Sequence, residues 1–148
     1  MSISDSTEAN LLNLIFRGTA WATFADNATA GAPETTISFA LHTASPGDAG
    51  TMATSEANYT SYARATVNRG TGFNAATGSP SACFLAANLD FATSTGSGTT
   101  MTDFSTGHSG AAASAQPILW TGGISPSIAV GASGIIPRLT TASSVTLD

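Results

Sequence analysis

Charged residues are scarce in this chain. Only 9% of its 148 residues are Asp, Glu, Lys or Arg, whereas roughly 25% is typical of a globular domain. Lysine is absent, the basic residues are four arginines scattered along the chain, and the formal net charge is -5. Binding to nucleic acid or to an anionic membrane needs clustered cations. The composition therefore predicts that neither is a partner.

Cysteine is nearly absent as well. The single residue, Cys83, excludes an intrachain disulfide, and its apolar neighbours at 82–85 predict a buried thiol. Paired cysteines, a His-x-x-x-His pattern and EF-hand spacing are missing, so we expect no metal and no cofactor. A signal-peptide pattern and a long apolar run are also missing. We therefore expect synthesis in the cytoplasm, without export of the chain by itself.

One helix is predicted, within residues 1–20. Ser4 or Ser6 can cap its start, and Gly18 after Arg17 is a typical stop. The acidic residues Asp5 and Glu8 suit the positive end of its dipole. The helix has a single apolar stripe, formed by Leu11, Leu12, Ile15 and Phe16. We expect that stripe to pack on the sheet or on a neighbouring subunit.

Short strands dominate the rest of the sequence. Ile37, Phe39 and Leu41 alternate with small or polar residues, which predicts a strand over 35–43 with one buried face. Further strands are expected at 61–68, 83–85, 89–92, 101–104, 116–121, 127–130, 135–139 and 144–147. This spacing is typical of an all-β fold, a β-sandwich or jelly roll of about eight short antiparallel strands. We expect one domain over residues 1–148.

The sequence offers few groups for catalysis. His42 ends the first predicted strand, where Asp48 could orient it as a base in a small hydrolase. The structural alternative is a partly buried histidine that binds the backbone of the following turn. The acids are spread singly, and no Gly-x-Ser-x-Gly pattern is present. We therefore expect no catalytic residues and interpret the chain as a structural protein.

A surface rich in Ser, Thr, Ala and Gly loses little side-chain entropy when it is covered. Such a surface suits a chain that functions inside an assembly. Aromatic residues and arginines are the usual anchors of protein interfaces. We therefore regard Tyr59, Tyr62, Arg64 and Arg69 as candidate contact residues. Trp120, in an alternating segment, is expected to lie in the core.

Three segments are similar to a small family of structural proteins of tailed phages. They are the N-terminal helix at 9–16, the strand and turn at 37–50, which contain Ala-Leu-His-Thr-Ala-Ser-Pro-Gly at 40–47, and the segment 55–64 with Glu56, Tyr62 and Arg64. The end of the chain, 139–148, resembles the β-rich tail of that family. Family members are described as tail-fibre or capsid-associated proteins, without catalytic residues.

The resemblance implies a virion protein made in the bacterial host. Our first expectation is a capsid cement or decoration protein, which binds the outer capsid surface and stabilises the DNA-filled head. Its partners would be the major capsid protein and further copies of itself, as a homodimer or homotrimer. The alternative is a tail or tail-fibre component that contacts the host surface, by exposed aromatic loops that bind sugar.

Overall fold

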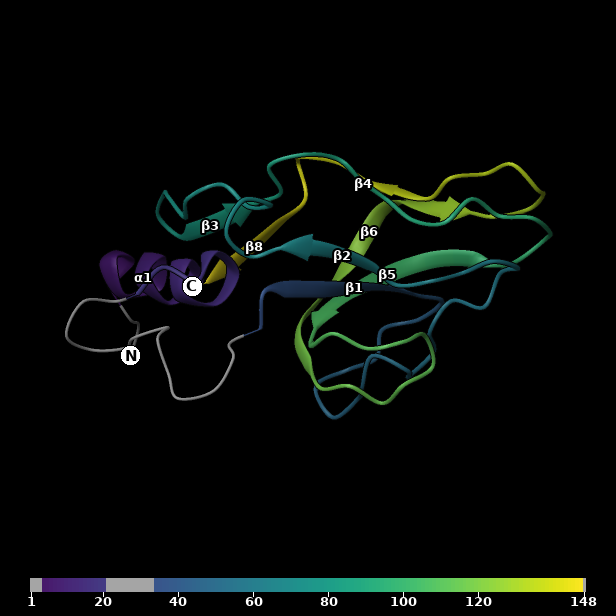
Figure 1. Ribbon diagram of the computed structural model, residues 1–148, viewed down its shortest axis with the longest axis horizontal. Coiled ribbons are helices and arrows are strands. Elements are labelled where there is room, and N and C mark those ends of the chain that lie inside the picture. Colours follow the sequence, from purple (N-terminus) through teal and green to yellow (C-terminus); the bar gives the residue numbers. More distant parts are fainter. Residues whose placement is uncertain (1–3, 21–33, 148) are drawn as a thin grey trace. The chain divides into compact units, whose positions relative to one another are not determined.

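The computed structural model describes residues 4–20 and 34–147 and is mostly β (Figure 1). The helix α1 spans Asp5–Arg17. The strands are β1 (Thr36–His42), β2 (Ala65–Asn68), β3 (Ser81–Phe84), β4 (Leu89–Asp90), β5 (Thr100–Gly107), β6 (Ile118–Ala129), β7 (Arg138–Leu139) and β8 (Ser144–Leu147). The expectation of an all-β chain with eight short strands in antiparallel sheets and one N-terminal helix is confirmed. The packing of two layers as in a jelly roll stays a prediction.

The strands form three sheets within two compact units. The largest sheet has the order β2-β1-β5-β6, and two small sheets pair β3 with β8 and β4 with β7. The first unit contains residues 1–36, 67–89 and 139–148, and the second contains residues 37–66 and 90–138. Each unit is therefore assembled from segments that are distant in sequence. The expectation of one domain over residues 1–148 stays a prediction.

In the first unit, α1 begins and ends at the predicted residues. Ser4 is the N-cap, and its hydroxyl accepts from the Thr7 amide. Gly18 is the C-cap in the left-handed conformation, with φ 63°, which glycine adopts without the penalty of a Cβ atom. Leu12 and Phe16 are fully buried, and the rings of Phe16 and Phe73 lie 5.0 Å apart between centroids. The predicted apolar stripe thus anchors this unit.

Glu8 binds a strand in addition to its place in the helix. Its side chain is 3% exposed, and Oε2 accepts a hydrogen bond of 3.0 Å from the Ser81 amide at the start of β3. β3 pairs with β8 in an antiparallel register that places Cys83 opposite Val145. Cys83 is buried as predicted, and burial raises the pKa of its thiol to about 11.

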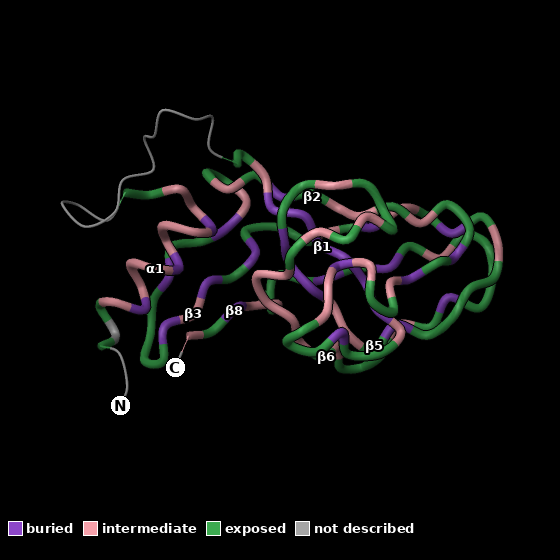
Figure 2. Tube along the Cα trace, turned by 90° about the horizontal axis from the view of Figure 1, so that it is seen from below, coloured by how far each residue is buried: buried purple, intermediate pink, exposed green. Residues whose placement is uncertain are grey.

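In the second unit, β1 is buried on both faces. The predicted exposed face is wrong, because the whole run from Ile37 to His42 is buried (Figure 2). Residues 43–57 return along this strand: the Thr43 amide donates to the Ser55 carbonyl, and the Ala57 amide donates to the Leu41 carbonyl. These bonds pair the segment with the edge of β1. The segment also contacts the face that the alternating pattern had assigned to solvent, because the Thr54 carbonyl lies 2.8 Å from Nδ1 of His42.

β6 lies at an edge of the four-stranded sheet and is longer than predicted. The two segments expected at 116–121 and 127–130 join into this one strand of 12 residues. Met101 pairs with Ile128, but Asp103 already pairs with Gly123, so residues 124–127 bulge out of register. A bulge can accommodate Pro126, because a proline has no N–H to donate to the neighbouring strand. Trp120 is partly exposed on this strand, so the expectation that it lies in the core is wrong.

Candidate functional site: a buried polar cluster beneath a returning loop

Four polar residues from the two middle segments of the phage resemblance meet in the second unit. His42 ends β1, and Glu56 forms an isolated antiparallel bridge with it. Tyr62 and Arg64 follow six and eight residues after Glu56. We call His42, Glu56, Tyr62 and Arg64 the buried polar cluster. The returning segment 43–57 positions the cluster, since its backbone hydrogen bonds to β1 set where Glu56 lies.

Glu56 and Arg64 form the centre of the buried polar cluster. The Arg64 guanidinium donates from Nε to Oε1 over 2.7 Å and from Nη2 to Oε2 over 2.8 Å. The side chains of Arg64 and Glu56 are only 2% and 5% exposed. Arg64 also donates to the carbonyl and the hydroxyl of Ser114, and the Ala113 amide donates to Oε2. A desolvated bidentate pair of this kind fixes two loops at once.

The two tyrosines belong to the same part of the structure. Tyr62 Oη donates to Glu56 Oε1 over 3.0 Å and accepts from the Leu41 amide over 3.1 Å. Burial is the main cause that raises the pKa of Tyr62 far above its usual value. Tyr59 is 2% exposed, donates to the Ala92 carbonyl and meets the Tyr62 ring edge-on at 5.3 Å. The Tyr59 ring is therefore buried inside the unit, and the partly exposed Tyr62 packs against it.

His42 is fully buried and bound at both ring nitrogens. Nδ1 lies 2.8 Å from the Thr54 carbonyl, and Nε2 lies 2.7 Å from Ser105 Oγ on β5. A carbonyl only accepts hydrogen bonds, so Nδ1 carries the proton and Nε2 accepts from the serine. Burial lowers the pKa of His42, although the Thr54 carbonyl acts in the opposite direction. The ring is thus a neutral clamp between the loop and the sheet.

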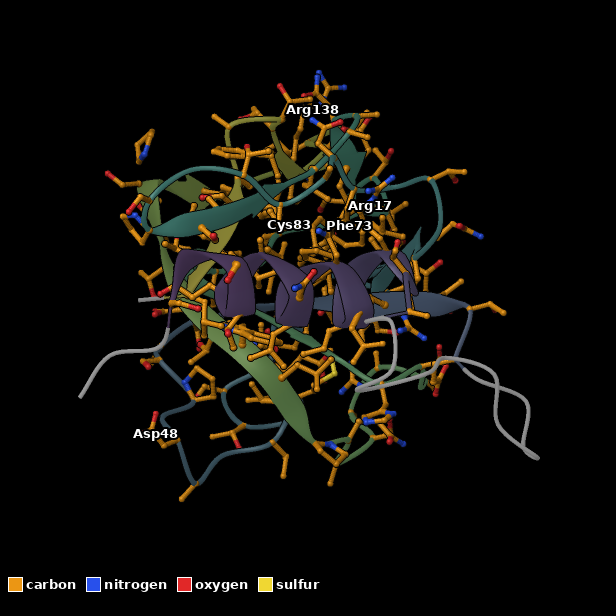
Figure 3. All side chains as sticks on the ribbon, turned by 90° about the vertical axis from the view of Figure 1, so that its left-hand side faces the viewer. Arg17, Asp48, Phe73, Cys83 and Arg138 are labelled. Carbon is orange, nitrogen blue, oxygen red and sulfur yellow. The ribbon has the colours of Figure 1, made fainter. Side chains whose placement is uncertain are left out.

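The pair of Ser105 and His42 has the spacing of a nucleophile and its base. Both side chains, however, have no exposed surface, so a substrate carbonyl has no route to Ser105 Oγ in this structure. Asp48 does not orient His42, because Nδ1 already faces Thr54. Asp48 lies on an exposed outer loop (Figure 3). The structural alternative for His42, a histidine that binds the backbone of the following loop, fits the geometry.

Arg69 belongs to the first unit. Its guanidinium donates to the carbonyls of Leu14, Ile15 and Glu34 over 2.5 to 2.6 Å. Leu14 and Ile15 are in the last turn of α1, where backbone carbonyls lack helical partners. Arg69 therefore caps the end of α1 and ties the start of the segment before β1 to it.

The structure thus brings Tyr59, Tyr62 and Arg64 together and places Arg69 in another unit. All four have internal hydrogen-bond partners, and their role in contacts with another protein stays a prediction. Sequence reasoning missed Glu56, Ser105 and Ser114 as their partners. Only Glu56 carried a signal, as an acid close in sequence to Tyr62 and Arg64. Partners contributed by distant strands and loops leave no local pattern.

Within residues 4–20 and 34–147, no group of three or more His, Cys, Asp or Glu side chains is arranged to hold a metal ion. In the same residues, no helix has the length and apolar character that a membrane span requires. The ionisable side chains of the buried polar cluster serve internal contacts. In the part of the chain that the structure describes, the fold is thus β-rich and this cluster joins its loops to its main sheet.

Residues 2–145 match the family model described as Podophage GP4 fiber I protein gp80, so the chain belongs to that family. It is accordingly a structural protein of a bacteriophage, as the resemblance implied. The Leu-His-Thr-Ala-x-Pro-Gly segment as a signature of the family stays a prediction. No curated protein and no solved structure matches the chain.

Proposed function

We propose that this chain is a subunit of a fibre on a podophage virion. The observation that carries the proposal is the family match, which covers residues 2–145 and names a fibre protein. It favours the tail or tail-fibre alternative over the capsid cement protein that was our first expectation. The major capsid protein is then not the partner that the proposal requires.

The fold is consistent with such a role. A fibre subunit has to keep its shape under mechanical load while neighbouring chains cover much of its surface. The desolvated pair of Arg64 and Glu56 joins the loops around residues 56 and 113, and breaking such a pair is costly. The low charge of the chain suits surfaces that become covered.

Sugar binding by exposed tyrosines receives no support from the geometry. Tyr59 and Tyr62 were the best aromatic candidates in the polar loop region, but their rings meet edge-on. Their hydroxyls bind Ala92, Leu41 and Glu56. A fibre subunit that contacts the host would need other residues. The proposal therefore concerns fibre structure and does not assign a receptor-binding surface.

The location of the chain on intact particles tests the proposal. Fab fragments raised against the purified chain are added to virions, which are then viewed by electron microscopy. We expect Fab density along fibres and none on the capsid lattice. Disruption of particles into fibre-bearing and DNA-filled head fractions provides a second readout. Density spread over the capsid faces, with the chain in the head fraction, would contradict the fibre proposal and support the cement alternative.

A further inference from the structure

Three turns in the second unit share one unusual backbone feature. Within residues 4–20 and 34–147, the only non-glycine residues with a positive φ are Ser55, Ser61 and Ala113, at 52°, 77° and 63°. This left-handed region is unfavourable for residues that have a Cβ atom, and the surrounding structure must offset its cost. All three residues are exposed, so burial of their side chains does not account for the conformation.

Each of these residues occupies the third position of a four-residue turn. The turns are 53–56, 59–62 and 111–114, and in each of them the amide of the last residue donates to the carbonyl of the first. A positive φ at the third position favours glycine or asparagine. Serine or alanine occupies that position in all three turns, so the local sequence does not by itself favour them.

The last residue of each turn belongs to one hydrogen-bond network. The turns end at Glu56, Tyr62 and Ser114. The Glu56 carboxylate accepts from Tyr62 Oη over 3.0 Å and from the Ala113 amide over 2.8 Å. Arg64 donates both to this carboxylate and to the carbonyl and hydroxyl of Ser114. The buried carboxylate and its arginine thus hold all three turns.

We infer that the turns 53–56, 59–62 and 111–114 form a strained latch, which opens as one unit while the pairing of β1 with β5 stays intact. Unfavourable backbone conformations persist where their surroundings over-determine them, and they are concentrated in segments that switch between states. When the network around Glu56 breaks, all three turns lose the contacts that offset their conformation. β1 pairs with β5 through a register that does not involve Glu56.

The latch adds a conformational change to the proposed structural role and does not rest on the assignment to a fibre. A subunit with such a latch has two states, which share a sheet and differ in their loops. The charge of Glu56 decides between them. Without it, Arg64 is a cation with a 2% exposed side chain and no counter-charge from Glu56, and opening the latch returns this cation to water.

Native-state hydrogen exchange of the full chain in increasing urea tests the inference. The amides of Glu56, Tyr62 and Ser114 close the three turns, and they should exchange with one common opening free energy. In water, after correction for intrinsic rates, they should exchange at least tenfold faster than the slowest amides between β1 and β5. Their urea slope should also be smaller, because local opening exposes less surface than global unfolding.

Two neighbouring alanines provide a matched pair of variants. Ala112 and Ala113 are both exposed and belong to the same turn, but only Ala113 has a positive φ. Ala113→Gly relieves the left-handed conformation and should slow exchange about threefold at all three turn-closing amides, although two of these lie in the other turns. Ala112→Gly brings the flexibility of glycine without that relief, so it should speed exchange at the same amides.

A second pair of variants tests the role of the charge. Glu56→Gln removes the charge that closes the latch, and Asp90→Asn removes the same charge from the exposed pair with Arg138. Glu56→Gln should raise the exchange rates of the turn-closing amides at least tenfold, with the amides between β1 and β5 still the slowest. Asp90→Asn should leave these rates unchanged within replicate scatter.

The inference is wrong if the turn-closing amides exchange with the free energy and urea slope of the amides between β1 and β5. It is equally wrong if Ala113→Gly slows only the Ser114 amide, because the turns then open separately, or if a folded Glu56→Gln behaves like Asp90→Asn. The first two results need no change at Glu56, so they decide the question even if Glu56→Gln does not fold. Fab labelling on virions is independent of all of them, so the latch and the proposed function fail separately.

Discussion

Removing Arg64 should destabilise the chain far more than removing an arginine from an exposed pair. Glu56 accepts four hydrogen bonds, two from Arg64, one from Tyr62 and one from the Ala113 amide. Arg64→Met removes two of them and leaves a carboxylate that is 5% exposed without its cation. Breaking a buried pair from one side costs about 3–5 kcal/mol.

Thermal unfolding followed by circular dichroism measures this effect. In a chain of this size, each kcal/mol lowers Tm by about 2–4 °C, so Arg64→Met should lower Tm by roughly 6–20 °C. The matched control is Arg138→Met. Arg138 also forms a bidentate pair, with Asp90, but the two side chains are 49% and 46% exposed. Solvent screens such a pair, so Tm should stay within replicate scatter.

A double variant separates the lost pair from lost packing. Glu56→Leu combined with Arg64→Met removes both charges, so no buried carboxylate remains unpaired. It should unfold at a higher temperature than Arg64→Met alone, although Tyr62 and the Ala113 amide then lack their acceptor. The reasoning is refuted if Arg64→Met behaves like Arg138→Met, or if the double variant is as unstable as the sum of the single changes.

Two further predictions follow from the pKa shifts. Burial lowers the pKa of His42 from its usual value of 6.5, so below pH 6.5 the unfolded chain binds a proton that the folded chain does not. The contribution of His42 to the free energy of unfolding should therefore be constant above pH 6.5. Below pH 6.5 it should fall by up to about 1.4 kcal/mol per pH unit, until the folded histidine also binds a proton. Urea unfolding at a series of pH values should show this slope in the wild type. His42→Gln should abolish the slope, and the control His108→Gln, at an exposed position, should retain it. An unchanged slope in His42→Gln would show that His42 is not its cause. Cys83, buried and with its pKa raised to about 11, should react with a thiol reagent at neutral pH only after denaturation, and labelling of the native chain at the rate of a free thiol would disprove its burial.

Elements defined by local chemistry could be predicted from the sequence. The bounds of α1 follow from Ser4 and Gly18, whose capping geometry depends only on adjacent backbone. β8 was expected at 144–147 and lies there. Period-two alternation likewise located β1, because the pattern depends on the strand itself.

Features that depend on distant segments could not be predicted. On the second face of β1, the His42 side chain is met by the Thr54 carbonyl of the returning segment, and alternation cannot show which loop contacts a strand. β6 was divided in two because Pro126 and the glycines at 122 and 123 interrupt its pattern, whereas pairing with β5 continues on both sides of the bulge. The hydrogen-bond partners of Arg64 and Arg69 could not be predicted either, because they lie far away in the sequence. Acceptors such as the Ser114 and Leu14 carbonyls leave no local sequence pattern.

The scarcity of charge has two consequences that depend on each other. Arg64 and Arg69 direct their guanidinium groups at internal acceptors, where the arginine fork can satisfy several oxygens at once. Cations used in this way are not available to protect an exposed strand, and β6 accordingly has an edge without charge.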